Sequence, residues 1–169
     1  MKKSILIFVL TAIILLANSQ TIQGLTKIKI DPKISVDSLV AHCTDISPKI
    51  NAKNFEIIES EPYMVEAKVF YFSSAVNRDS ILKFMLEQGF VPANFLESII
   101  IASTIKDFSL FPLIAFGAEF RSATSDDDFV LYVDKSVWGC ELSVVPQHYG
   151  KQWKKSYKFL GVKREFFIK

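Results

Sequence analysis

Residues 81–120 constrain the fold more than any other part of the chain, because two breaks divide their apolar pattern into helices and a strand. The first helix is predicted from apolar side chains at helical spacing, namely Ile81, Leu82, Phe84, Met85 and Leu86. Asn77 or Asp79 is expected to cap its start. Gly89 ends it, because glycine adopts the left-handed conformation that follows many helices, and Pro92 prevents a simple continuation.

A second helix is predicted after this break, as far as about Lys106. Asn94 and Glu97 have the spacing of a capping box, with Asn in place of the usual Ser or Thr. Residues 99–101 are three isoleucines with high β propensity, so a strand is the alternative there. The caps favour the helix. Glu97 could also be considered as a catalytic acid, but its capping role accounts for it.

The C-terminal half is expected to form a sheet. Residues 110–120 are apolar on both faces as far as Glu119, which is typical of a central strand covered on both sides, with Pro112 at its start. Further strands are predicted at residues 129–133, 139–145 and 157–167, with turns at 122–128 and 134–136 and a loop at 147–155. The predicted fold class is α+β, with two short helices packed on one face of an antiparallel sheet that ends in a four-strand meander.

The N-terminal half gives weaker patterns. Residues 20–33 are polar and contain Gly24 and Pro32, so they are interpreted as a flexible lead-in with a short strand at 25–30. A single domain is expected over residues 34–169. Within it, strands are predicted at residues 34–43, 55–60 and 63–73, the last from a period-2 alternation rich in β-branched and aromatic side chains.

The first 19 residues have the features of a secretory signal peptide. Lys2 and Lys3 precede an apolar run at residues 5–16, and small residues at 17–19 suit cleavage after Ser19. The apolar run is shorter than the roughly 20 residues that span a bilayer, although a retained membrane anchor is the alternative. The mature protein is therefore expected in the periplasm or outside the cell, without a membrane span.

Charge and cysteine content refine this prediction. Loss of Lys2 and Lys3 reduces the 20 basic residues to 18, which equals the 18 acidic residues, so no nucleic-acid partner is expected. Cys43 and Cys140 would meet an oxidising compartment after export and could form a disulfide. Two separate buried thiols are the alternative.

The usual catalytic and metal-binding patterns are missing from the sequence. His42 adjoins Cys43, and His148 follows Cys140, but a cysteine nucleophile needs an activated thiolate, and Cys140 lies in a predicted strand. The Cys and His residues do not have zinc-ligand spacing, and no phosphate loop or nucleophile elbow occurs. Residues 126–128 are three aspartates that could bind calcium, but a solvated turn is favoured. No catalytic residue, metal or cofactor is predicted.

The segment from residue 147 to the C-terminus combines lysines with aromatic side chains. A candidate binding surface is formed by Tyr149, Lys151, Trp153, Lys154 and Lys155. Exposed aromatic rings beside cations could bind an anionic polymer, a carbohydrate or the phosphates of a membrane surface. The alternative is a solvated strand edge protected by its lysines, with Trp153 folded into the core.

Three motifs occur in a familiar order at residues 87–93 (EQGFVPA), 111–117 (FPLIAFG) and 159–164 (FLGVKR). In order and spacing they resemble a group of small uncharacterised bacterial proteins. Members of this group have two helices joined by Gly–aromatic–x–Pro–Ala, then a Phe–Pro strand, a hairpin and a final strand. The resemblance covers about residues 80–165. It implies a shared fold unit and no catalytic residue.

These observations lead to three functional hypotheses. The first is a non-enzymatic, exported binding or interaction domain whose partner is an anionic or carbohydrate component of the cell envelope, or another protein. The second is a small periplasmic hydrolase that uses His148 with an acidic partner that the sequence does not identify. The third is a structural protein of the envelope.

Overall fold

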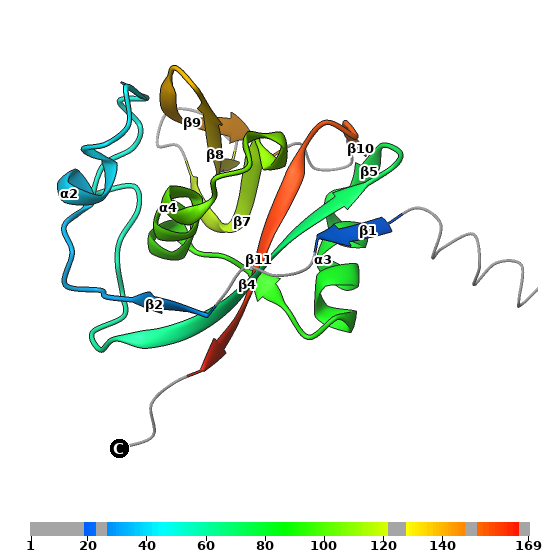
Figure 1. Cartoon of the computed structure of the whole chain (residues 1–169), viewed down its shortest axis with the longest axis horizontal. Coiled ribbons are helices and arrows are strands. Elements are labelled where there is room, and N and C mark those ends of the chain that lie inside the picture. Colours follow the sequence, from blue (N-terminus) through cyan, green and yellow to red (C-terminus); the bar gives the residue numbers. More distant parts are fainter. Residues whose placement is uncertain (1–18, 23–26, 122–127, 148–151, 166–169) are drawn as a thin grey trace, which may run out of the picture.

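A computed structural model describes residues 19–22, 27–121, 128–147 and 152–165. Within these residues the chain has the predicted α+β fold (Figure 1). The main sheet contains β1 (Ser19–Ile22), β2 (Ile28–Ile30), β3 (Asp45–Ile46), β4 (Tyr63–Phe72), β6 (Val91–Pro92), β7 (Leu113–Arg121), β8 (Asp128–Ser136), β9 (Gly139–Pro146) and β11 (Lys158–Glu165). A second, two-stranded sheet pairs β5 (Val76–Asn77) with β10 (Gln152–Trp153).

The helices are α2 (Val36–Val40), α3 (Arg78–Glu87) and α4 (Phe95–Thr104), and a short 3₁₀ helix, η1, spans Phe108–Leu110. None of the helices in the described part of the chain is long and apolar enough to cross a membrane.

The local signals for α3 and α4 are confirmed. The Asn77 side chain accepts a hydrogen bond from the Ser80 amide at 2.8 Å, and Gly89 follows α3 with a φ of 78°. Both bonds of the capping box are present, since the Glu97 amide donates to Asn94 at 2.9 Å and the Asn94 amide donates to Glu97 at 2.8 Å. The three isoleucines at 99–101 are therefore helical, as the caps indicated.

The order of strands in the main sheet is β1-β4-β11-β7-β8-β9-β3. Strand β11 lies between β4 and β7, antiparallel to β4 and parallel to β7. The predicted four-strand meander is therefore wrong in its last strand, because only β7, β8 and β9 follow one another. The central position of β11 is explained by its buried side chains on both faces of the sheet, which include Phe159, Leu160 and Val162.

Helices α3 and α4 lie on opposite faces of the sheet, which corrects the prediction that both pack on one face. Val65 and Val69 of β4 point into the core that contains α4, whereas Phe70 and Phe72 point into the core that contains α3. Strand β6 connects the two helices. It pairs with β11 just beyond the residues of β11 that pair with β7. A Cβ on Gly117 would lie 2.6 Å from the carbonyl oxygen of Ala93, so β7 and β6 are in close backbone contact there.

Three further predictions are corrected. Residues 36–40 form helix α2 instead of a strand, because Val36, Leu39 and Val40 share one apolar face and Ser35 caps the start. No strand forms at 55–60, where the ring of Phe55 instead stacks on Phe95 at 4.7 Å. The predicted turn at 134–136 belongs to β8, and the chain turns at residues 137–138.

The predicted lead-in contains two strands, β1 and β2, both of which pair with β4. The short strand expected at 25–30 corresponds to β2. Strand β7 confirms the predicted central strand: Leu113, Ile114 and Phe116 are buried, and Pro112 precedes the strand.

Candidate functional site

Trp153, the central residue of the basic and aromatic surface predicted near the C-terminus, is buried and so is not part of a surface. Trp153 is only 7% exposed and packs against the rings of Phe116, Tyr157 and Phe159 at 5.4–5.9 Å. The alternative interpretation, with Trp153 folded into the core, is therefore the one observed. The main reason is the pairing of β10 with β5, which places Trp153 over the face that α3 covers.

The other members of that surface have different outcomes. Lys154 and Lys155 are exposed. Tyr149, Lys151 and the candidate catalytic His148 lie outside the described residues, so their roles stay predictions.

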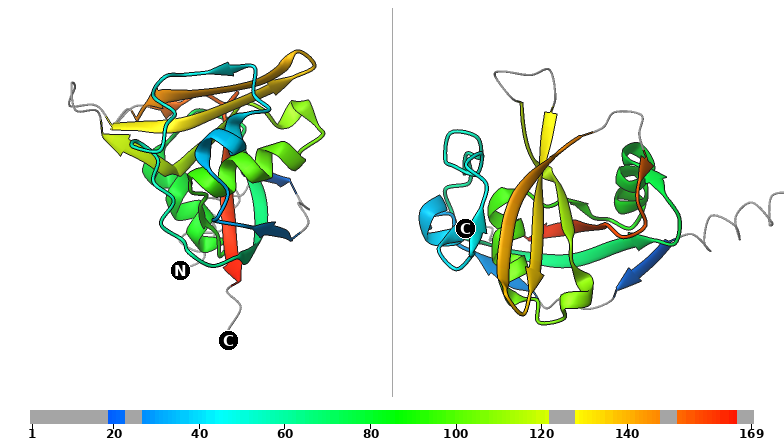
Figure 2. Two further views of the ribbon diagram at one scale, coloured as in Figure 1. Left: turned by 90° about the vertical axis from the view of Figure 1, so that its left-hand side faces the viewer. Right: turned by 90° about the horizontal axis from the view of Figure 1, so that it is seen from above.

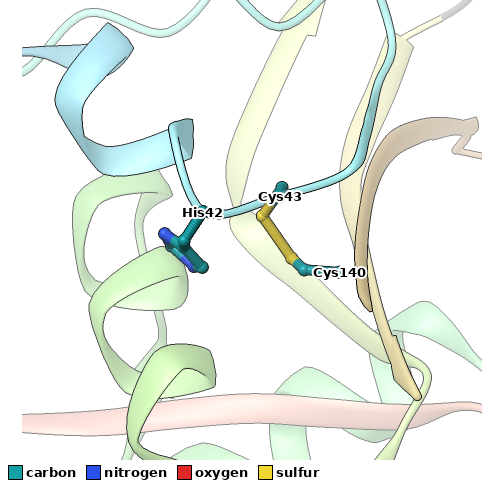
Figure 3. A group of neighbouring side chains, drawn as sticks. All are labelled: His42, Cys43 and Cys140. Carbon is teal, nitrogen blue, oxygen red and sulfur yellow. A yellow bond between two sulfur atoms is a disulfide. The ribbon is translucent and has the colours of Figure 1, made fainter. Parts of the chain in front are cut away.

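The predicted disulfide between Cys43 and Cys140 is present (Figure 3), with Cα atoms 4.4 Å apart. Both sulfur atoms are bonded, so neither can act as a nucleophile or a metal ligand. His42 is exposed beside the bridge, at the end of α2 (Figure 3). Among the described residues, His42 and the two cysteines are the only group that brings three potential metal ligands together, and the disulfide occupies two of them.

Glu97 is a structural carboxylate. Its side chain is 0% exposed and accepts hydrogen bonds from the Asn94 amide, from the Tyr63 hydroxyl at 3.1 Å, and from Arg164 Nε and Nη2 at 2.6 and 2.8 Å. Burial, followed by the charge of Glu97, raises the pKa of the Tyr63 hydroxyl, and the hydrogen bond from Arg164 to Glu97 raises the pKa of Arg164. With four donors around it, Glu97 is held as a hydrogen-bond acceptor.

A hollow of about 520 Å³ lies beside Arg164. Most of the charged side chains that line it already form hydrogen bonds or ion pairs with other residues. Arg164 binds Glu97, Glu59 accepts from Asn94 Nδ2 at 2.7 Å, and Glu119 pairs with Arg78 at 3.2 Å. The aromatic rings that line the hollow belong to Phe55 and Phe95, which are buried. The remaining lining groups include the exposed side chains of Lys53, Glu56 and Ile58 but no exposed aromatic ring, so the hollow is a weaker candidate than a surface with one.

The turn between β8 and β9 presents two exposed apolar side chains, one of them the most exposed large apolar side chain in the described part of the chain. Val137 is 76% exposed and Trp138 is 88% exposed. The turn has two residues, since Ser136 pairs directly with Gly139, whose φ of 140° favours glycine. An indole ring in water contributes nothing to the core, so Trp138 is a candidate contact residue.

The turn lies against the end of α4. Lys135 Nζ donates to the carbonyl oxygens of Ala102, Ser103 and Ile105, at 3.3, 3.4 and 2.9 Å. Both views in Figure 2 place the β8–β9 turn and the end of α4 at the same end of the molecule. Lys135 thus holds the turn in place and is itself occupied by backbone carbonyls.

Three carboxylates form a row across the strands beside Trp138. Asp134 pairs in register with Glu141, and Glu141 pairs in register with Asp45. Because residues directly opposite one another share a face, the three side chains lie side by side. Together with Trp138 they line a hollow of about 200 Å³. We call Asp45, Asp134, Val137, Trp138 and Glu141 the hairpin-tip surface.

The charge of this row is not balanced by an ion pair within the described residues. Asp134 accepts hydrogen bonds from the Tyr132 hydroxyl at 3.1 Å and from the Lys135 amide at 2.8 Å, and burial together with Asp134 raises the pKa of the Tyr132 hydroxyl. Lys158 lies near Asp134, but its ammonium group donates to the carbonyl of Phe111 at 2.7 Å, and burial lowers its pKa.

The disulfide holds this surface in shape. Cys140 immediately precedes Glu141, and Cys43 lies two residues before Asp45, so the bridge places these two carboxylates next to each other. The Thr44 amide donates to the Cys140 carbonyl at 2.9 Å, and a Cβ on Gly139 would collide with the Thr44 side chain.

The hairpin-tip surface does not follow from the sequence prediction, because the predicted turn at 134–136 starts three residues before the observed one and leaves Trp138 next to a predicted strand. The available signal was a glycine directly after two large apolar residues, Val137 and Trp138, between two strand patterns. Comparison of the chain with protein families, with curated proteins and with solved structures gives no match. Inference of function therefore depends on the site itself.

Proposed function

We propose that the protein is an exported, non-enzymatic binding domain that acts through the hairpin-tip surface. The observation that carries the proposal is Trp138, an indole 88% exposed at the tip of a hairpin that a disulfide and Lys135 hold in place. Tryptophan is the residue most enriched among the side chains that dominate binding energy. A rigid support lowers the entropy lost on binding.

Binding is favoured over catalysis by the state of the candidate catalytic groups. Cys43 and Cys140 are bonded to each other, and Glu97 is surrounded by donors. His42 is exposed beside the disulfide, where neither sulfur can serve as a nucleophile. Among the described residues, these groups therefore form no nucleophile and base pair.

Export is proposed from the N-terminal segment, and the disulfide is compatible with it because structural disulfides persist in oxidising compartments. N-terminal sequencing of the protein recovered from the periplasm or the medium is expected to start at Gln20. A protein that stays in the cytoplasm with its first residues intact would contradict export.

The binding role is tested by titrating the purified protein with a cell-envelope fraction from the source cells. We expect Trp138→Ala to weaken binding by tenfold or more, as for a central aromatic residue in an interface. The matched control is Leu86→Ala, because Leu86 is also exposed, at 69%, but lies on α3. Lys154→Ala with Lys155→Ala tests the surface that the sequence suggested.

The replaced side chains of Trp138, Leu86, Lys154 and Lys155 are all exposed, so their loss should leave the core intact. Circular dichroism should therefore show the same fold in every variant. If Trp138→Ala binds the envelope fraction as tightly as the natural protein does, the hairpin-tip surface is not the binding site. If only the double lysine variant loses binding, the basic surface is the binding site instead.

A further inference from the structure

We infer that the hairpin-tip surface binds a basic segment of another polypeptide, in which a lysine or arginine is adjacent to an apolar side chain. This inference rests on the proposed function and names the class of partner. It combines the apolar tip, Val137 and Trp138, with the carboxylate row of Asp45, Asp134 and Glu141, which forms no ion pair within the described residues.

The carboxylate row indicates the charge of the partner. Like charges directly opposite one another on neighbouring strands destabilise a sheet, and this row contains two such pairs, Asp134 with Glu141 and Glu141 with Asp45. The neighbouring ammonium of Lys135 is bound by the carbonyls at the end of α4, on the other face of the sheet. A cationic partner would neutralise the row, and an anionic polymer or membrane surface would be repelled.

The geometry of the row indicates a polypeptide instead of a single cation. The three carboxylates do not bring their oxygen atoms together as a metal site does, since the only such group in the described residues is the one at His42. They lie on three adjacent strands, so the row extends over two strand spacings, about 10 Å. Long, flexible side chains on one chain can reach several points along such a row.

The tip supplies the apolar part of the contact. The Trp138 ring adjoins the hollow that the carboxylates line, so a bound cation can lie against the ring while its charge faces the row. Val137 extends the apolar area beside it. A neutral polysaccharide could stack on Trp138 but would leave the three charges uncompensated, so we favour the basic polypeptide.

The test uses the purified protein and labelled octapeptides, followed by fluorescence anisotropy. The probes are an alternating lysine–leucine peptide, its glutamate–leucine and serine–leucine counterparts, and a chitin hexasaccharide as the carbohydrate. We expect binding of the lysine–leucine peptide to exceed that of the serine–leucine peptide by tenfold or more. Salt should weaken it, because the contributing charges are partly exposed.

Two double variants distinguish the effect of this site on binding from the effect of the protein's net charge. Asp134→Asn with Glu141→Gln should weaken the lysine–leucine peptide by about three- to tenfold, the loss expected for two partly exposed charge pairs. Glu56→Gln with Glu87→Gln removes the same charge from exposed positions elsewhere and should leave binding unchanged. Trp138→Ala should also weaken the peptide.

Several outcomes would overturn the inference. Equal losses in the two paired variants would show non-specific attraction, and equal binding of the three peptides would show a purely apolar site. Binding of the hexasaccharide in place of the peptides would show a carbohydrate partner. If the envelope fraction still binds through Trp138 while all peptides fail, only the class of partner is wrong; if Trp138→Ala leaves binding to the envelope fraction unchanged, the proposed function itself fails.

Discussion

Replacing Arg164 with methionine is the sharpest test of how the fold tolerates a carboxylate in its core. The variant Arg164→Met keeps an apolar stem on β11 but removes two hydrogen bonds, of 2.6 and 2.8 Å, to Glu97. Glu97 is 0% exposed, so its charge cannot recover these interactions from bulk water. It keeps only the Tyr63 hydroxyl and the Asn94 amide as donors.

Removing one partner of a buried ion pair costs about 3–5 kcal/mol, because the remaining charge is buried without compensation. The Arg164 side chain is 26% exposed, so some water can reach Glu97 from that side, and we expect the lower limit, about 3 kcal/mol. Urea titration measures the loss. With a slope of about 2 kcal/mol per molar urea, the midpoint should fall by about 1.5 M.

Two further variants control this experiment. Lys163→Met removes a positive charge from the adjacent, exposed position of β11 and should change the free energy of unfolding by no more than about 0.5 kcal/mol. Adding Glu97→Gln to Arg164→Met should recover part of the loss, because the buried charge is gone. A loss below about 1 kcal/mol in Arg164→Met, or no recovery in the double variant, would refute the assignment of Arg164 as the compensating charge.

Three more predictions concern stability. Reduction of the Cys43–Cys140 bridge, which joins residues 97 positions apart, should lower the free energy of unfolding by about 4–5 kcal/mol in denaturant titrations with and without reductant; an unchanged midpoint would contradict it. Gly117→Ala should cost about 1–3 kcal/mol in thermal unfolding, because its Cβ would collide with the Ala93 carbonyl, and a neutral result would show that β6 can move. Lys135→Met should lower the free energy of unfolding by about 1 kcal/mol in the same assay, because three carbonyl contacts at the end of α4 are lost. Unchanged stability would show that water satisfies those carbonyls equally well.

Features that depend on near neighbours in the chain could be predicted from the sequence. The cap of α3 at Asn77, its end at Gly89 and the capping box between Asn94 and Glu97 all act within a few residues. The central strand β7 was also predicted, since an uninterrupted apolar run has few other places in an α+β fold. Helix α2 was missed because five residues are too few to distinguish helical from strand periodicity.

Features that depend on distant partners could not be predicted. The position of β11 between β4 and β7 and the passage of β6 between the two faces are set by pairings between remote segments. The same holds for the two tryptophans. Trp153 is buried because β10 pairs with β5, whereas Trp138 is exposed because a two-residue turn ends there. Gly139, directly after Trp138, is a sequence signal for that turn, whereas nothing adjacent to Trp153 in the sequence indicates its burial.

The position of β11 has a consequence for when the protein can fold. Strand β11 is the last described element of the chain, yet it separates β4 from β7 in the middle of the sheet. As the polypeptide is synthesised, its earlier strands therefore have no common partner until residues 158–165 emerge, and each half leaves an apolar edge unpaired until then. In a chain that crosses a membrane in extended form, this order of assembly would delay closure of the sheet until residues 158–165 have crossed.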